Sequence, residues 1–221
     1  MEITAKMVAD LRQMTGVGMM ECKKALTQSN GDMDKAIKYL SEQGQVKVAK
    51  RAGKIAAEGV IGTYTHGAGK MVGIVEVNCE TDFAAKNEKL VAFAKDMAMQ
   101  VVAAMPKVVS REELDASYIE EQKALFRTQL ANDPKFAGKP ENVIANIVEG
   151  KLNKHYEEVC LIDQAFIKDP DKKIQDVLND LTLVIGEKIT IRRFVRWEVG
   201  EGLEKRKDDF AAEVAAQAGN V

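Results

Sequence analysis

The first 44 residues show hydrophobic positions at helical spacing, interrupted by short breaks. Thr4 can cap a first helix. The apolar face of this helix would carry Met7, Val8, Leu11 and Met14. A second helix is predicted over about 19–28, before a break at 30–31. Asp32 can cap a third helix, which we expect to end before Gly44. Because helices this short are marginal alone, we predict that the three pack together as a bundle.

A different pattern, typical of strands, begins after this region. Residues 58–65 and 70–79 are rich in Val, Ile, Thr and Tyr, and the glycine-containing segment between them suits a hairpin loop. A third such segment follows much later, at 188–199. Its apolar residues, which interleave with polar and charged ones, are Ile189, Ile191, Phe194, Val195 and Trp197. We therefore predict a three-stranded antiparallel sheet with one covered face.

Helical spacing returns between the hairpin and the third strand. A stripe that begins near Asn87 stops at Met105, which Pro106 follows. Ser117 and Glu120 fit a capping box for the next helix, and the turn at 133–139 joins it to another that Pro140 can start. These two helices predict an antiparallel helical hairpin.

Two more helices complete the pattern. The first follows Asp169 and Pro170 and ends at Gly186, and a weak apolar stripe over about 205–217 predicts the second. Residues on this last stripe are Phe210, Val214 and Ala218.

The fold class is therefore α+β, in four parts. Residues 1–44 form the helical bundle, 45–57 a basic linker, 58–200 an α+β core with the helical hairpin inserted at about 107–165, and 201–221 a C-terminal helical module. The basic residues of the linker are Lys47, Lys50, Arg51 and Lys54. A solvated linker helix is our first interpretation of them, and contact with an acidic protein surface is the alternative.

Composition narrows the classes of function. The chain has 221 residues, of which 46% are hydrophobic, and 32 basic residues stand against 34 acidic ones, for a net charge of −2. Binding to nucleic acid through the whole chain usually needs a basic excess, so we expect none. No apolar run approaches the ~20 residues of a membrane span, and the first eight residues do not resemble a signal peptide. We expect a cytoplasmic protein without membrane binding.

The residues that usually carry metal or covalent chemistry are sparse. Cys22, Cys79 and Cys160 lie too far apart for a zinc motif or a disulfide framework, and His66 and His155 are isolated. No phosphate loop, dinucleotide-binding fingerprint or nucleophile elbow occurs. We therefore expect no metal, no cofactor, no direct nucleotide binding and no catalytic residue, which argues against an enzyme.

One segment, residues 79–86, has an unusual local sequence. It leaves the second strand and places Asp82 beside Phe83 in the turn ahead of the helix at Asn87. The residues alone favour an arrangement in which Asp82 caps the turn while Phe83 folds back into the core. The alternative is that Phe83 is an exposed apolar wedge on a rigid turn, as interface anchors often are.

Four segments match a known family. They are LRQMTGVGMMECKKAL at 11–26, EVNCETDF at 76–83, FVRWEVGEG at 194–202 and DFAAEVA at 209–215. In order and spacing, the chain resembles the bacterial translation elongation factor Ts family over essentially its whole length. Two long motifs in register are far more specific than a single short pattern.

The resemblance implies a function and a partner. Members of this family are guanine nucleotide exchange factors for elongation factor Tu, the GTPase that carries aminoacyl-tRNA to the ribosome. The N-terminal bundle would be a ubiquitin-associated (UBA)-like domain. Its contact face toward the G domain would carry Arg12, Met19, Met20 and Lys23. The alternative for the two methionines is core packing, although neighbours on a helix point about 100° apart, so at least one should face outward.

The resemblance also assigns a role to the unusual turn. Phe83 would wedge between helices of the G domain, while its neighbours disturb the magnesium site of the GTPase. The residues of this wedge are Thr81, Asp82, Phe83 and Ala84. At position 84 the family usually has valine, so this contact is smaller here.

The length of the chain indicates a short form of the family. Longer members carry two sheet-bearing subdomains, whereas only one such sheet can be assembled here. We therefore predict a homodimer, which would restore a double-sheet body. The alternative is a monomer in which the predicted helices at 87–104 and 171–185 cover the sheet within one chain. The alternative function, from another class, is a non-catalytic interaction module that uses the UBA-like bundle.

Overall fold

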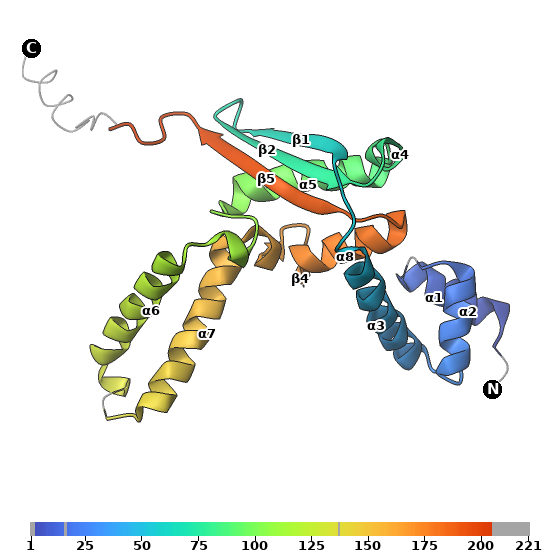
Figure 1. Ribbon diagram of the computed structural model, residues 1–221, viewed down its shortest axis with the longest axis horizontal. Coiled ribbons are helices and arrows are strands. Elements are labelled where there is room, and N and C mark those ends of the chain that lie inside the picture. Colours follow the sequence, from blue (N-terminus) through green and yellow to red (C-terminus); the bar gives the residue numbers. More distant parts are fainter. Residues whose placement is uncertain (1–2, 16, 137, 205–221) are drawn as a thin grey trace, which may run out of the picture.

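The computed structural model describes residues 3–15, 17–136 and 138–204, so the predicted helix at 205–217 lies outside the described residues. The helices are α1 (Ala5–Thr15), α2 (Met19–Gln28), α3 (Met33–Arg51), α4 (Asp82–Ala85), α5 (Glu88–Ala104), α6 (Ala116–Ala131), α7 (Glu141–Val159) and α8 (Ile174–Ile185). The strands are β1 (Glu58–His66), β2 (Met71–Cys79), β3 (Ala165–Phe166), β4 (Asp169–Lys173) and β5 (Thr190–Glu198). This mixture of helices with an antiparallel sheet confirms the α+β class (Figure 1).

The N-terminal bundle forms as its hydrophobic stripes predict. Thr4 Oγ1 accepts a hydrogen bond from the Met7 amide at 3.3 Å, and the Asp32 carboxylate accepts one from the Lys35 amide at 3.0 Å. The residues buried between the three helices are Val8, Leu11, Cys22, Ala25, Leu26, Ala36 and Leu40. Met14 is 65% exposed, so its predicted place on the apolar face is wrong.

The third helix does not end before Gly44, as its sequence had suggested. α3 continues to Arg51, and Gly44 is buried within it. A Cβ atom at position 44 would lie 2.7 Å from Leu183 Cδ1 of α8. The glycine therefore allows α3 and α8 to approach closely, and this packing outweighs the low helix propensity of glycine.

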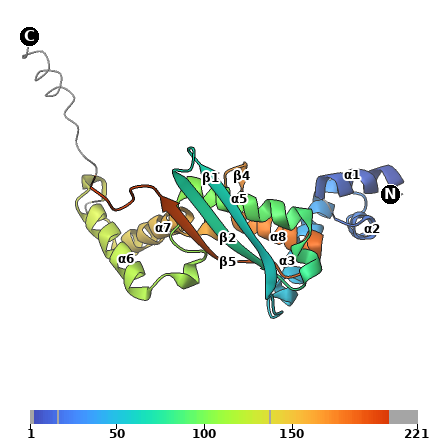
Figure 2. The same cartoon turned by 90° about the horizontal axis from the view of Figure 1, so that it is seen from above.

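The main sheet has the strand order β1-β2-β5, and both pairings are antiparallel, as predicted. α5 covers one of its faces (Figure 2). A Cβ atom at Gly62 or Gly73 would collide with the carbonyl oxygens of Ala94 or Ala98 in α5. The two glycines thus let the helix lie directly against the strands.

An irregularity in β5 interrupts the predicted alternation of side chains. The pairing with β2 shifts between Glu76 and Val77, so that both Arg192 and Arg193 reach the Glu76 carboxylate, at 2.8 and 2.7 Å. Hydrogen bonds from these two arginines lower the pKa of Glu76 to about 2. The bulge and the two ion pairs with Glu76 thereby fix the register of β5 against β2.

The helical hairpin of α6 and α7 projects away from the sheet, as Figure 1 shows. Its base is fixed by Arg111, which donates to both carboxylate oxygens of Asp163 at 2.8 and 2.7 Å and lies 4.5 Å above the Tyr156 ring. The capping box predicted at Ser117 is wrong, because α6 begins at Ala116 and Asp115 occupies the N-cap position.

A second, two-stranded sheet was missing from the sequence prediction. β3 pairs with β4 beside α8, and the sequence of β4, DPDKK, has no apolar alternation that would indicate a strand. Short 3-10 helices occur at Arg111–Glu113, Pro134–Phe136 and Leu161–Asp163. None of the helices in the described ranges is both long and apolar enough to cross a membrane.

Candidate functional site

The turn after β2 presents an aromatic side chain to solvent. Thr81 is the N-cap of the one-turn helix α4, and its hydroxyl accepts a hydrogen bond from the Ala84 amide at 3.3 Å. Ala84 is buried against the core, whereas Phe83 is 81% exposed. The interpretation that Phe83 folds back is therefore wrong. The turn begins at Thr81 rather than Asp82, and Ala84 takes the inward position.

Charged groups surround this exposed ring. The Asp82 carboxylate pairs with Lys86 Nζ at 2.8 Å, and that ammonium lies 5.7 Å from the centroid of the Phe83 ring. The hydrogen bond from Lys86 lowers the pKa of Asp82, and the same bond raises the pKa of Lys86. At neutral pH the turn thus carries a carboxylate, an ammonium group and an aromatic ring next to one another.

The carboxylates of Glu80 and Glu187 link the turn to other parts of the chain by hydrogen bonds. Glu187 accepts hydrogen bonds from the amides of Glu80 and Thr81 and from the Thr81 hydroxyl. The Glu80 carboxylate accepts from the Lys188 amide and from Arg51. The contacts of Glu187 and Lys188 with the turn were not predictable from the sequence, because partners more than 100 positions apart leave no local pattern.

The second predicted contact face lies on α1 and α2. Met19 and Met20 are 46% and 79% exposed, so neither belongs to the core of the bundle. Arg12 on α1 and Lys23 on α2 are also exposed. Unbranched, polarisable methionine side chains suit an adaptable contact surface.

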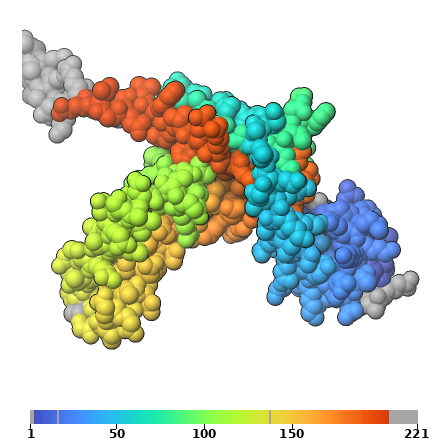
Figure 3. Space-filling model, viewed as in Figure 1, coloured from blue at the N-terminus to red at the C-terminus, as the bar shows by residue number. Residues whose placement is uncertain are grey.

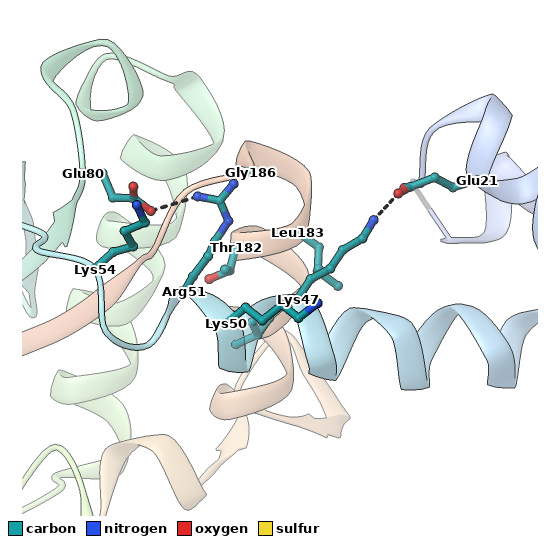
Figure 4. Close-up of a pocket in the computed structure, with 10 residues that line it drawn as sticks. Glu21, Lys47, Lys50, Arg51, Lys54, Glu80, Thr182, Leu183 and Gly186 are labelled. Carbon is teal, nitrogen blue, oxygen red and sulfur yellow. Dashed lines mark hydrogen bonds and ion pairs between the residues drawn. The ribbon is translucent and has the colours of Figure 1, made fainter.

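α3 connects this face to the Phe83 turn. Lys47 of α3 pairs with Glu21 of α2, and Arg51 at the end of α3 pairs with Glu80 at 3.0 Å (Figure 4). Both ion pairs line a cleft of about 670 Å³ between α3 and α8. The basic segment that was predicted as a linker therefore uses two of its cations within the chain.

The two groups of predicted residues lie at the same end of the molecule. In Figure 1, α4 and the bundle are on one side, and the hairpin of α6 and α7 is on the other. The space-filling view shows the bundle and the hairpin as separate arms (Figure 3). The Phe83 turn and the helices that carry Met19 and Met20 are thus two separate surfaces, which α3 connects.

The cysteines are not poised for chemistry. Cys22, Cys79 and Cys160 are buried and free. Burial raises the pKa of the Cys160 thiol to about 11 and raises that of Cys79 as well. The Cys79 thiol donates to the Thr81 carbonyl at 3.1 Å, so it serves the turn as a structural donor. Among the described residues, no group of three His, Cys, Asp or Glu side chains could hold a metal ion.

The chain is similar over almost its whole length to known proteins of one family. A family model described as "Elongation factor TS" matches residues 2–201. A curated relative from Desulforamulus reducens, "Elongation factor Ts", is 56% identical over 216 residues, which cover 98% of each chain. The proteins of the same name from Acetivibrio thermocellus and Geobacter sulfurreducens are 53% and 51% identical. The alignments cover 97% and 99% of this chain and 98% and 100% of those relatives.

Proposed function

Because the chain belongs to the elongation factor Ts family of translation elongation factors, we propose that it is a guanine nucleotide exchange factor for elongation factor Tu. It binds this GTPase, accelerates GDP release and allows GTP to rebind. The observation that carries the proposal is Phe83, an aromatic side chain held 81% exposed on a capped turn. Contact with a partner would remove this apolar side chain from water, which is favourable.

The proposed mechanism needs no covalent chemistry. A GTPase holds GDP largely through magnesium and through backbone amides around the phosphates. Phe83 wedges between helices of the G domain, and Asp82, flanked by Thr81 and Ala84, disturbs the magnesium environment. Because Asp82 is paired with Lys86 in the free protein, binding replaces a solvent-exposed ion pair, which is worth little.

The second contact surface anchors the complex. Arg12 and Lys23 bring positive charge to the G domain, and Met19 and Met20 supply apolar contact. Since bound factor weakens GDP binding, GDP weakens factor binding by the same ratio, and excess GTP completes the cycle. This mechanism requires no nucleotide, nucleic-acid or membrane site on the chain. It takes place in the cytoplasm, where the partner delivers aminoacyl-tRNA.

The direct test is release of a fluorescent GDP analogue from elongation factor Tu. We expect the purified protein to accelerate release when it is present at less than one molecule per GTPase, because an exchange factor turns over. Binding without acceleration would instead support the alternative, an interaction module that uses the UBA-like bundle.

We also propose that two copies of the chain pair through the uncovered face of the main sheet. A Cβ atom at Gly62 or Gly73 would face α5. Because successive residues of a strand face opposite sides of the sheet, Ile61 and Val72 lie on the other face. Trp197, which pairs with Val72, lies on that face as well. Ile61 and Trp197 are 56% and 62% exposed. No helix of the described residues lies over this face in Figure 2. A second copy would bury these apolar side chains by isologous packing.

Sedimentation equilibrium at micromolar concentration tests this pairing. We expect a mass of twice 24.3 kDa. The variant Trp197→Glu should shift the equilibrium toward the monomer, because it buries a charge in the interface. Leu125→Glu, at an exposed position of α6, is the matched control and should leave the mass unchanged. A wild-type mass near 24.3 kDa without concentration dependence would exclude the dimer.

A further inference from the structure

The Glu187 side chain concentrates three hydrogen bonds on the first residues of the Phe83 turn. Its Oε2 atom accepts from the Glu80 amide at 3.1 Å and from the Thr81 amide at 3.0 Å. Its Oε1 atom accepts from the Thr81 hydroxyl at 2.7 Å. Glu187 follows the end of α8, so these bonds tie the turn to a distant part of the chain.

The Thr81 hydroxyl connects Glu187 to the exposed ring. This hydroxyl has one proton, which it donates to Glu187, and its lone pairs accept the Ala84 amide. Glu187 thereby fixes the orientation in which the hydroxyl caps α4. A helix of one turn has almost no stability of its own, so its conformation depends on such external bonds.

The connection is reciprocal. Glu80, the residue before Thr81, accepts from the Lys188 amide at 2.6 Å and from Arg51 at 3.0 Å. Lys188 Nζ in turn donates to the carbonyl oxygens of Ala52 and Lys54 beyond the end of α3, at 2.7 and 2.9 Å. The Glu187 side chain therefore holds the turn, and the neighbouring Lys188 side chain holds the segment that follows α3.

We propose that Glu187 is a positioning residue for nucleotide exchange, which acts through Thr81 to hold Phe83 in its projecting conformation before the partner binds. This inference rests on the proposed function. An ordered turn has less conformational freedom to lose on insertion between helices of a partner, so preorganisation favours the wedged state. Docking of α1 and α2, by contrast, does not depend on the turn.

The experiment combines hydrogen exchange of the free protein with GDP release. In Glu187→Gln, an amide group that donates replaces one carboxylate oxygen that accepts. We expect the amides of Glu80, Thr81 and Ala84 to exchange at least about tenfold faster than in the wild type. The maximal rate of GDP release should fall by about tenfold, whereas the half-saturating concentration should change by less than about threefold. Glu121→Gln, at an exposed site on α6, makes the same charge change and should alter none of these quantities.

A double variant tests whether Glu187 acts through Thr81. Thr81→Val removes the hydroxyl, and it should loosen the same amides. In the double variant with Glu187→Gln, amide exchange and the maximal rate of GDP release should match those of the more affected single variant. Both substitutions remove the same hydrogen bond between the Thr81 hydroxyl and Glu187, so their effects should not multiply. If Glu187→Gln fails to fold, Thr81→Val still reports the loss of this connection.

Two results would overturn the proposal. One is unchanged amide exchange at the turn in Glu187→Gln, and the other is multiplication of the two single effects in the double variant. If the wild-type protein did not accelerate GDP release from elongation factor Tu, the proposed function would be refuted instead. Hydrogen exchange of the amides would still decide whether Glu187 orders the turn. A uniform rise in exchange across all helices would show that Glu187 contributes only to global stability, which also contradicts a positioning role.

Discussion

Phe83→Ala is expected to slow GDP release from elongation factor Tu by about 30-fold or more while the thermal midpoint stays near that of the wild type. A central aromatic anchor typically contributes ~2 kcal/mol or more to an interface, and each 1.4 kcal/mol corresponds to about a factor of ten. Because the side chain is 81% exposed in the free protein, its removal leaves no cavity in the core. The measurements are fluorescent GDP release and thermal unfolding by circular dichroism.

Phe166→Ala is the matched control for this variant. Phe166 is 8% exposed and belongs to the core beneath the main sheet, so its truncation should destabilise the fold by about 3–5 kcal/mol. Exchange per folded molecule should be unchanged. The assignment of Phe83 to the interface would be refuted if Phe83→Ala lowered the midpoint in the same way and left exchange per folded molecule intact.

The orientation of Phe83 shows what local sequence could not decide. Thr81 and Asp82 are both good N-cap residues, and the choice between them determines which of the following side chains points inward. In the structure Thr81 is the cap, and its hydroxyl also donates to Glu187, a residue 106 positions away. The competition is thus settled by tertiary contact, which the local pattern does not contain.

Elements with local determinants were predictable. The bundle follows from its hydrophobic stripes and from the caps at Thr4 and Asp32, and the hairpin of β1 and β2 follows from strand-forming residues around a glycine-rich loop. The exposure of Met20 also agrees with helical geometry. The predicted helix end before Gly44 was wrong, because this glycine serves close packing against Leu183 and does not end the helix. The strand β4 was missed because its sequence has no apolar pattern.

Arg12 and Lys23 are the charged residues of the proposed contact face on α1 and α2. Arg12→Glu combined with Lys23→Glu should lower the association rate with elongation factor Tu by about tenfold at low salt, because exposed charges at an interface act mainly on the encounter step. The dissociation rate should change much less. The deficit should shrink as ionic strength rises, since the Debye length falls from about 30 Å at 0.01 M to about 8 Å at 0.15 M. Stopped-flow association over this range of salt measures both effects.

A charge-matched control separates a local contact from the change in net charge. Lys135→Glu with Lys139→Glu reverses two exposed charges near the tip of the helical hairpin, at the opposite end of the molecule from α1 and α2 (Figure 1). Both double variants become more negative by four charges, so a loss caused by overall charge would appear equally in the two. We expect the slower association only in the variant of Arg12 and Lys23. Equal association rates of that variant and the wild type at low salt would remove these two residues from the interface and leave the Phe83 turn as the main contact.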